Sequence, residues 1–132
     1  MTDATAAAWP KGISNITLFA EDLTATKAFY LAVFGRPVVF EDEDSAVFNF
    51  GNTQINLLRT SAAPELIEPA VVAPIEAGSR FQFTIDVDDV DAMCEELARR
   101  GVELLNGPID RPWGVRTASF RDPAGHIWEI AK

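Results

Sequence analysis

The sequence predicts an α+β fold made of two copies of one module, in which a strand and a helix are followed by three more strands. The first observation is an internal repeat, because residues 15–25 (NITLFAEDLTA) overlay residues 82–92 (QFTIDVDDVDA) without a gap. The second is that each copy begins with apolar residues at alternate positions and then changes to helical spacing. The third is that three short strand patterns follow each helix. Together they predict two pseudo-symmetric βαβββ modules.

The first module is expected to occupy about residues 12–58. Apolar residues alternate along its opening strand, and a helix follows with Asp22 or Thr24 as its N-cap. Gly35 comes after the last apolar residue at helical spacing and is expected to end the helix. The three later strands are expected near residues 37–41, 45–50 and 53–58.

The second module is expected to occupy about residues 81–131. Asp89 or Asp91 is expected to cap its helix, and Gly101 to end it. The later strands are expected near residues 102–105, 115–120 and 126–131. A type I turn is expected before the last strand, because the segment DPAG (residues 122–125) has Asp first, Pro second and Gly fourth. His126, the one histidine, follows this turn and is expected in solvent rather than as a metal ligand.

Residues 59–80 form a proline-rich linker between the modules. Pro64, Pro69 and Pro74 break any long helix or central strand in this segment. At about twenty residues the linker exceeds the usual connection, and connections of that length tend to be lids or flexible ties.

Length and composition favour a single domain over residues 1–132, because 48% of the residues are hydrophobic and supply a substantial core. One cysteine, Cys94, excludes an internal disulfide and fits a reducing cytoplasm. No apolar run approaches a membrane span. The net charge of −9 opposes binding to nucleic acid and to anionic membranes. We therefore expect a cytoplasmic protein with neither as a partner.

One face of the predicted sheets is polar. Successive side chains of a strand point to opposite faces, so the apolar positions identify the face that packs on the helices. The opposite face then carries a polar residue from four strands: Asn15 and Thr17, Gln54 and Asn56, Gln82 and Thr84, and Glu129. An open antiparallel sheet can show water such a face without binding anything. The repetition in both modules favours a binding site over this alternative.

The two modules, opened by residues 15–35 and 82–101 and closed by RPWGVRTASFRDPAGHIWEI (residues 111–130), resemble the vicinal oxygen chelate superfamily. That superfamily includes glyoxalases, extradiol dioxygenases and bleomycin-resistance proteins, and the resemblance covers about residues 12–131. It implies that the sheets curl into a ligand cup. It also implies a homodimer, in which modules commonly pair between chains. The segments PWGVR and RDPAG look most like the metal-free bleomycin-resistance branch.

The resemblance also implies which residues occupy the family's metal positions. By strand position these are Asn15, Asn56, Gln82 and Glu129, with Gln54 as the alternative to Asn56. Three of the four are neutral amides, whereas transition metals are held by imidazoles, thiolates and carboxylates. We therefore expect no metal and no other cofactor.

Aromatic and basic residues near the polar face are further candidates for ligand contact. Phe48, Phe50 and Trp113 would supply flat walls for a planar ligand through stacking or cation–π contact. Arg116 would pair with an acidic ligand or with Glu129. Glu129 itself has three readings that the sequence leaves open: a proton-transfer group, the counter-charge of a cationic ligand, or the partner of an arginine.

The sequence thus gives two hypotheses for function. The first is a glyoxalase/bleomycin-resistance-like binding protein that sequesters a small, partly aromatic and cationic molecule, with Asn15, Phe48, Phe50, Asn56, Gln82, Trp113, Arg116 and Glu129 in its cup. The second is a metal-dependent enzyme of the same superfamily, a lyase, isomerase or dioxygenase, in which Glu129 is a metal ligand or a base. A role without any ligand is the third alternative.

Overall fold

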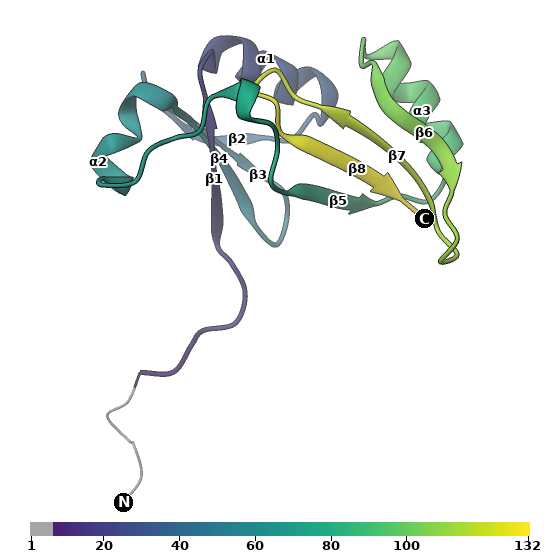
Figure 1. The fold of residues 1–132 in the computed structure, drawn as a ribbon, viewed down its shortest axis with the longest axis horizontal. Coiled ribbons are helices and arrows are strands. Elements are labelled where there is room, and N and C mark those ends of the chain that lie inside the picture. The colour runs from purple at the N-terminus through teal and green to yellow at the C-terminus, as the bar shows by residue number, and fades with distance from the viewer. Residues whose placement is uncertain (1–6) are drawn as a thin grey trace, which may run out of the picture.

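A computed structural model describes residues 7–132, and its elements follow the predicted order (Figure 1). The first module contains one helix and four strands: β1 (Asn15–Ala20), α1 (Leu23–Val33), β2 (Val38–Glu41), β3 (Ser45–Asn49) and β4 (Gln54–Arg59). The second repeats this order with β5 (Gln82–Asp86), α3 (Val90–Arg99), β6 (Leu104–Asp110), β7 (Arg116–Arg121) and β8 (Ile127–Ala131). The two βαβββ modules are therefore confirmed.

Each module forms its own four-stranded sheet with the same topology. The strand orders are β1-β4-β3-β2 and β5-β8-β7-β6. In both sheets the first strand runs parallel to the last, and the remaining pairs are antiparallel. The sheets do not close into a barrel.

Both main helices begin at the aspartates that the repeat aligns. The Asp22 carboxylate accepts a hydrogen bond from the backbone N–H of Ala25, and the Asp89 carboxylate accepts one from Ala92, each at 3.0 Å. These bonds satisfy N–H groups that have no partner inside the helix. The N-caps are thus Asp22 and Asp89, the first of each predicted pair.

The sixth strand differs from the prediction, since β6 covers Leu104–Asp110 instead of residues 102–105. Its pairing with β7 shifts between Leu104 and Asn106 and again between Asn106 and Ile109. These irregularities let the strand continue past Pro108, a residue that ordinarily interrupts a ladder. Gly107 lies in the middle, with φ of +93°.

The linker contains only short helical turns: η1 (Thr60–Ala62), α2 (Pro64–Ile67) and η2 (Ile75–Ala77). The prolines therefore prevent a long element, as expected. Within residues 7–132 no helix is long and apolar enough to cross a membrane. Residues 7–14 extend away from the body of the molecule (Figure 1).

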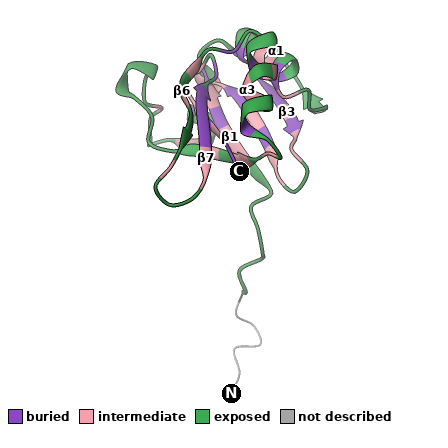
Figure 2. Cartoon of the chain, turned by 90° about the vertical axis from the view of Figure 1, so that its right-hand side faces the viewer, coloured by how far each residue is buried: buried purple, intermediate pink, exposed green. Residues whose placement is uncertain are grey.

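One hydrophobic cluster joins the two modules. It contains Leu18, Tyr30, Phe48 and Leu57 from the first module and Leu97, Phe120, Trp128 and Ile130 from the second. Figure 2 shows buried residues along β3 and β7 and exposed residues on the outer sides of α1 and α3. The apolar faces of both sheets thus pack into a shared core, and their polar faces point away from it.

A buried polar cluster, formed by Tyr30, Asp122, His126 and Trp128, also links the modules. The Tyr30 hydroxyl donates to Asp122 Oδ2 at 2.7 Å and accepts from Trp128 Nε1 at 3.2 Å. His126 Nδ1 lies 2.9 Å from the same Asp122 oxygen. The expectation that His126 lies in solvent is therefore wrong, since its side chain is only 13% exposed. The carboxylate of Asp122, the first residue of the DPAG turn, contacts the His126 ring and keeps it away from solvent.

Candidate functional site

The strand register places a matching polar pair on the outer face of each sheet. Thr17 lies beside Asn56 in the first module, and Thr84 lies beside Glu129 in the second. Asn56 Nδ2 donates to Thr17 Oγ1 at 3.3 Å, and Thr84 Oγ1 donates to Glu129 Oε1 at 2.9 Å. Asn56 is therefore the structural counterpart of Glu129. Gln54 takes a different place in the register, opposite Asn15.

The other two predicted positions open their sheets. Asn15 is the first residue of β1 and Gln82 the first residue of β5, and both side chains are exposed. Along β5 the side chains on the polar face, Gln82, Thr84 and Asp86, are all exposed. The polar face of the second sheet is thus open along this edge.

Glu129 is half-buried and lies among polar groups that the sequence analysis missed. Ser119 of β7 is its direct neighbour in the ladder and is 7% exposed. Thr117, two residues earlier on the same face, is 2% exposed and accepts a hydrogen bond from Arg111 Nε at 2.9 Å. Alternation along β7 would have found Ser119 and Thr117. Arg111 lies in the loop before β7, and a loop has no periodic pattern from which the direction of its side chain could be predicted.

Arg116 does not pair with Glu129. Its guanidinium forms ion pairs of 2.9 Å with Asp91 at the start of α3 and with Asp110 at the end of β6. Hydrogen bonds to these two carboxylates raise the pKa of Arg116 further above its ordinary range. Within residues 7–132 none of the ion pairs involves Glu129. Among the described residues, the Thr84 hydroxyl is the one side-chain donor to its carboxylate.

The predicted aromatic walls lie elsewhere. Phe48 is completely buried in the shared core, opposite Ile55 on the helix side of the sheet. Phe50 packs on Trp128 with a ring-centroid distance of 5.5 Å, also on the helix side. Trp113 lies at the tip of the hairpin between β6 and β7 and is 72% exposed. We therefore leave Phe48 and Phe50 out of the site on the polar face.

The residues at the family's metal positions do not fit a divalent transition metal. Asn15, Asn56 and Gln82 offer neutral amide oxygens, and Glu129 offers the one carboxylate. Within the described chain no group of three His, Cys, Asp or Glu side chains lies close enough together to hold a metal. The buried Oδ1 of Asn56 lacks a hydrogen-bond partner, so this position can still accept a bond from a donor.

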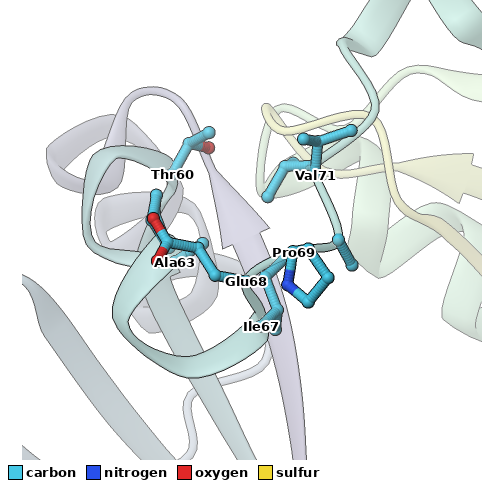
Figure 3. A pocket seen from close by; sticks show the side chains of 9 residues that line it. Thr60, Ala63, Ile67, Glu68, Pro69 and Val71 are labelled. Carbon is cyan, nitrogen blue, oxygen red and sulfur yellow. The ribbon is translucent and has the colours of Figure 1, made fainter.

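A hollow lies in the linker, and Figure 3 shows side chains that line it. It has a volume of about 740 Å³ and is lined by residues of a single stretch of chain, among them Thr60, Ile67, Pro69 and Val71. Its walls come from short turns and a loop. No residue of the candidate site reaches it.

Comparison with known proteins identifies the class. The model of the glyoxalase/bleomycin resistance protein/dioxygenase superfamily matches residues 12–130, and the chain belongs to this superfamily. It is 34% identical over 122 residues to the uncharacterized protein YraH of Bacillus subtilis, covering 89% of this chain and 95% of YraH. It is 26% identical over 121 residues to the metallothiol transferase FosB of Staphylococcus haemolyticus, covering 91% and 82% of the two chains.

Solved structures share the fold. A glyoxalase/bleomycin resistance protein/dioxygenase from Nocardioides superposes with a TM-score of 0.83 at 23% identity, covering 97% of this chain and 87% of the other. Lactoylglutathione lyase from Agrobacterium tumefaciens gives a TM-score of 0.75 at 24% identity, covering 92% and 93%. The superfamily thus contains enzymes, and the fold alone does not assign an activity to this chain.

Proposed function

We propose that this member is a binding protein that holds a small, partly aromatic and cationic molecule on the polar face around Glu129, without a metal. One observation carries the proposal: Glu129 is half-buried and has no cationic partner within residues 7–132. Its carboxylate is therefore free to pair with a cation that approaches the polar face. The ligand supplies that cation.

The neighbouring groups suit recognition better than chemistry. Thr84 bonds the Glu129 carboxylate, and Gln82 lies on the same face of β5, so both add groups that form hydrogen bonds without changing charge. Trp113, exposed at its hairpin tip, keeps a free aromatic face for the ligand or for a second chain.

The proposed assembly is a homodimer. The outer face of the second sheet is open along β5, and a cup needs an opposite wall. A module of a second chain would supply that wall, as the resemblance to the superfamily implies. Size-exclusion chromatography with light scattering tests the assembly, and a monomer at all concentrations contradicts it.

A binding screen tests the ligand class. Benzyltrimethylammonium and larger aromatic cations should raise the melting temperature, since a ligand at about 100 times its Kd stabilises by about 2.7 kcal/mol. Glu129→Gln keeps the shape and removes the charge, so it should weaken binding about tenfold or more. Glu65→Gln, an exposed linker position, is the control and should change nothing. Neutral analogues that bind as tightly as the cations would contradict the proposal.

The second candidate function is a metal-dependent enzyme, supported by the relative named metallothiol transferase. Elemental analysis of protein purified without chelator separates the two. A stoichiometric divalent metal in the wild-type protein that is lost in Glu129→Gln would favour the enzyme.

A further inference from the structure

An apolar groove lies between the modules, and most of its lining residues belong to the helix side of the sheets. It has a volume of about 710 Å³, inside the range of roughly 300–1,000 Å³ typical of small-molecule sites. Both modules line it, with residues that include Phe34, Phe50, Phe83, Ile85, Met93 and Trp128. Phe83 and Trp128 are apolar-face residues of β5 and β8, whereas Glu129 points to the opposite face.

The walls of the groove are aromatic and incompletely covered. Phe50 stacks on Trp128 at 19° between ring planes, and Phe83 lies 4.9 Å from the same indole. Phe50, Phe83 and Met93 are packed against the core but remain partly exposed. Apolar surface left open in a concavity lined by both modules is the usual form of a small-molecule site.

Two arginines line the groove where α1 ends. Arg100 donates through Nη1 to the carbonyl of Val33, and its Nε bonds Glu96 at 2.9 Å. Arg36 donates only through Nε, to the carbonyl of Asn49 at 2.9 Å, and none of the ion pairs within residues 7–132 involves it. Both Nη groups of Arg36 are therefore available, beside an apolar wall, in a chain of net charge −9.

From this arrangement we infer that the groove is a second ligand site, which takes a compact hydrophobic anion such as an aromatic carboxylate or sulfonate. The apolar body packs on Phe50, Phe83 and Met93, and the anionic group pairs with Arg36. The ligand differs in charge from the one proposed for the polar face. Thr84, which bonds the Glu129 carboxylate, also lines the groove, whereas Glu129 does not line the groove.

Two fluorescent compounds with one skeleton test the inference. 8-Anilinonaphthalene-1-sulfonate carries the anion, and N-phenyl-1-naphthylamine lacks it. The sulfonate should bind the folded protein at one saturable site. Arg36→Gln should weaken the sulfonate about fivefold, as a partly exposed charge contact does, and leave the affinity of the neutral compound unchanged. If Arg36→Gln weakens the binding of both compounds equally, Arg36 does not pair with the sulfonate and the inference fails.

Groove-filling variants locate the site. Val87→Trp places a large ring in the groove and should weaken both compounds at least about tenfold. Asn52→Trp, at an exposed position lining the same groove, should do the same and serves if Val87→Trp does not fold. Val71→Trp in the linker and Glu129→Gln on the polar face are the controls and should leave binding intact. Loss of binding in either control, with the groove variants unaffected, overturns the inference.

Other occupants of the groove give different results. The N-terminal segment leaves the body beside the groove, where the Thr53 hydroxyl bonds the carbonyl of Ile13, and its Trp9 is 96% exposed. If the sulfonate binds only after residues 1–12 are removed, this segment occupies the groove and the inference fails. If the apparent affinity falls as protein concentration rises, a second copy occupies it, and the inference also fails.

Discussion

The two modules share a frame and differ in the charge on their polar faces. Thr17 and Thr84 occupy the same place in their sheets, yet the first lies beside Asn56 and the second beside Glu129. The apolar faces of both sheets enter one core, which fixes their register. The polar faces are free of that constraint. The repeat therefore preserves the strand order and the apolar core positions. The polar residue beside the threonine is not preserved, and it is charged only in the second module.

The modules also differ in how their polar faces are covered. Thr17 and Phe19 of β1 line a hollow of about 230 Å³ together with linker residues such as Pro74 and Ile75. Along β5, by contrast, the polar-face residues are exposed. The linker thus lies against the polar face of β1 and against the DPAG turn of the second module, while the polar face of β5 stays open.

The largest expected difference in the free energy of unfolding is between substitutions at the turns that precede β4 and β8. Asp122 is fully buried and accepts bonds from Tyr30, from the backbone of Ala124 and from His126. Asn49 at the corresponding turn accepts one side-chain bond, from the backbone of Gly51 at 2.8 Å. Asp122→Ala should therefore lower the free energy of unfolding by about 3 kcal/mol or more, and Asn49→Ala by less than about 1 kcal/mol. Urea denaturation measures both, and equal losses would contradict the comparison.

Most of the frame follows from sequence pattern, whereas the cluster around Asp122 does not. The repeat, the caps at Asp22 and Asp89 and the DPAG turn all depend on short-range rules, and the structure reproduces them. The contact of Tyr30 with Asp122 joins residues 92 positions apart. No local rule indicates such a partner. For the same reason the sequence could not place Arg111 beside Thr117 or direct Arg116 toward Asp91.

A second prediction compares Gly107 in the edge strand β6 with Gly51 in the turn between β3 and β4, because only Gly107 is closely approached by other atoms. A Cβ on Gly107 would lie 2.5 Å from the carbonyl oxygen of Thr117, and φ is +93°. Gly51 has a similar φ of +95° but open space around it. Gly107→Ala should cost at least about 2 kcal/mol more than Gly51→Ala, since both share the backbone strain and only one adds a clash. Chemical denaturation of both variants measures the difference, and similar losses would mean that β6 shifts to make room.

A third prediction uses Tyr30, the single tyrosine of the chain, to follow the contact between modules. Burial, and then the negative charge of Asp122, hold the pKa of Tyr30 well above its ordinary value. Because the folded-state pKa is raised, the phenol contributes stability that is complete below about pH 10 and is lost as pH rises further. The loss should reach up to about 1.4 kcal/mol for each pH unit above about 10.

Urea unfolding of the wild type and of Tyr30→Phe at several alkaline pH values measures this loss. The variant should be less stable at pH 8 and should lack the tyrosine-dependent decline, while lysine titration affects both proteins alike. Tyrosinate absorbance should appear together with unfolding. Its appearance in the folded protein near pH 10 would show that the hydroxyl is open to solvent and that the modules are held together differently.

The smallest expected effect falls where the modules are most alike. Asp22 and Asp89 cap equivalent helices with bonds of the same length. An N-cap substitution removes one charge-assisted bond at an exposed helix end, so each alanine variant should lose about 1 kcal/mol. The two losses should agree within the error of denaturation experiments if both helices form in a single cooperative transition with the shared core. A larger loss for Asp89→Ala, or a separate early transition, would mean that the second module unfolds independently. Equal stability losses for the two variants would therefore show that the two modules are similar in stability as well as in structure.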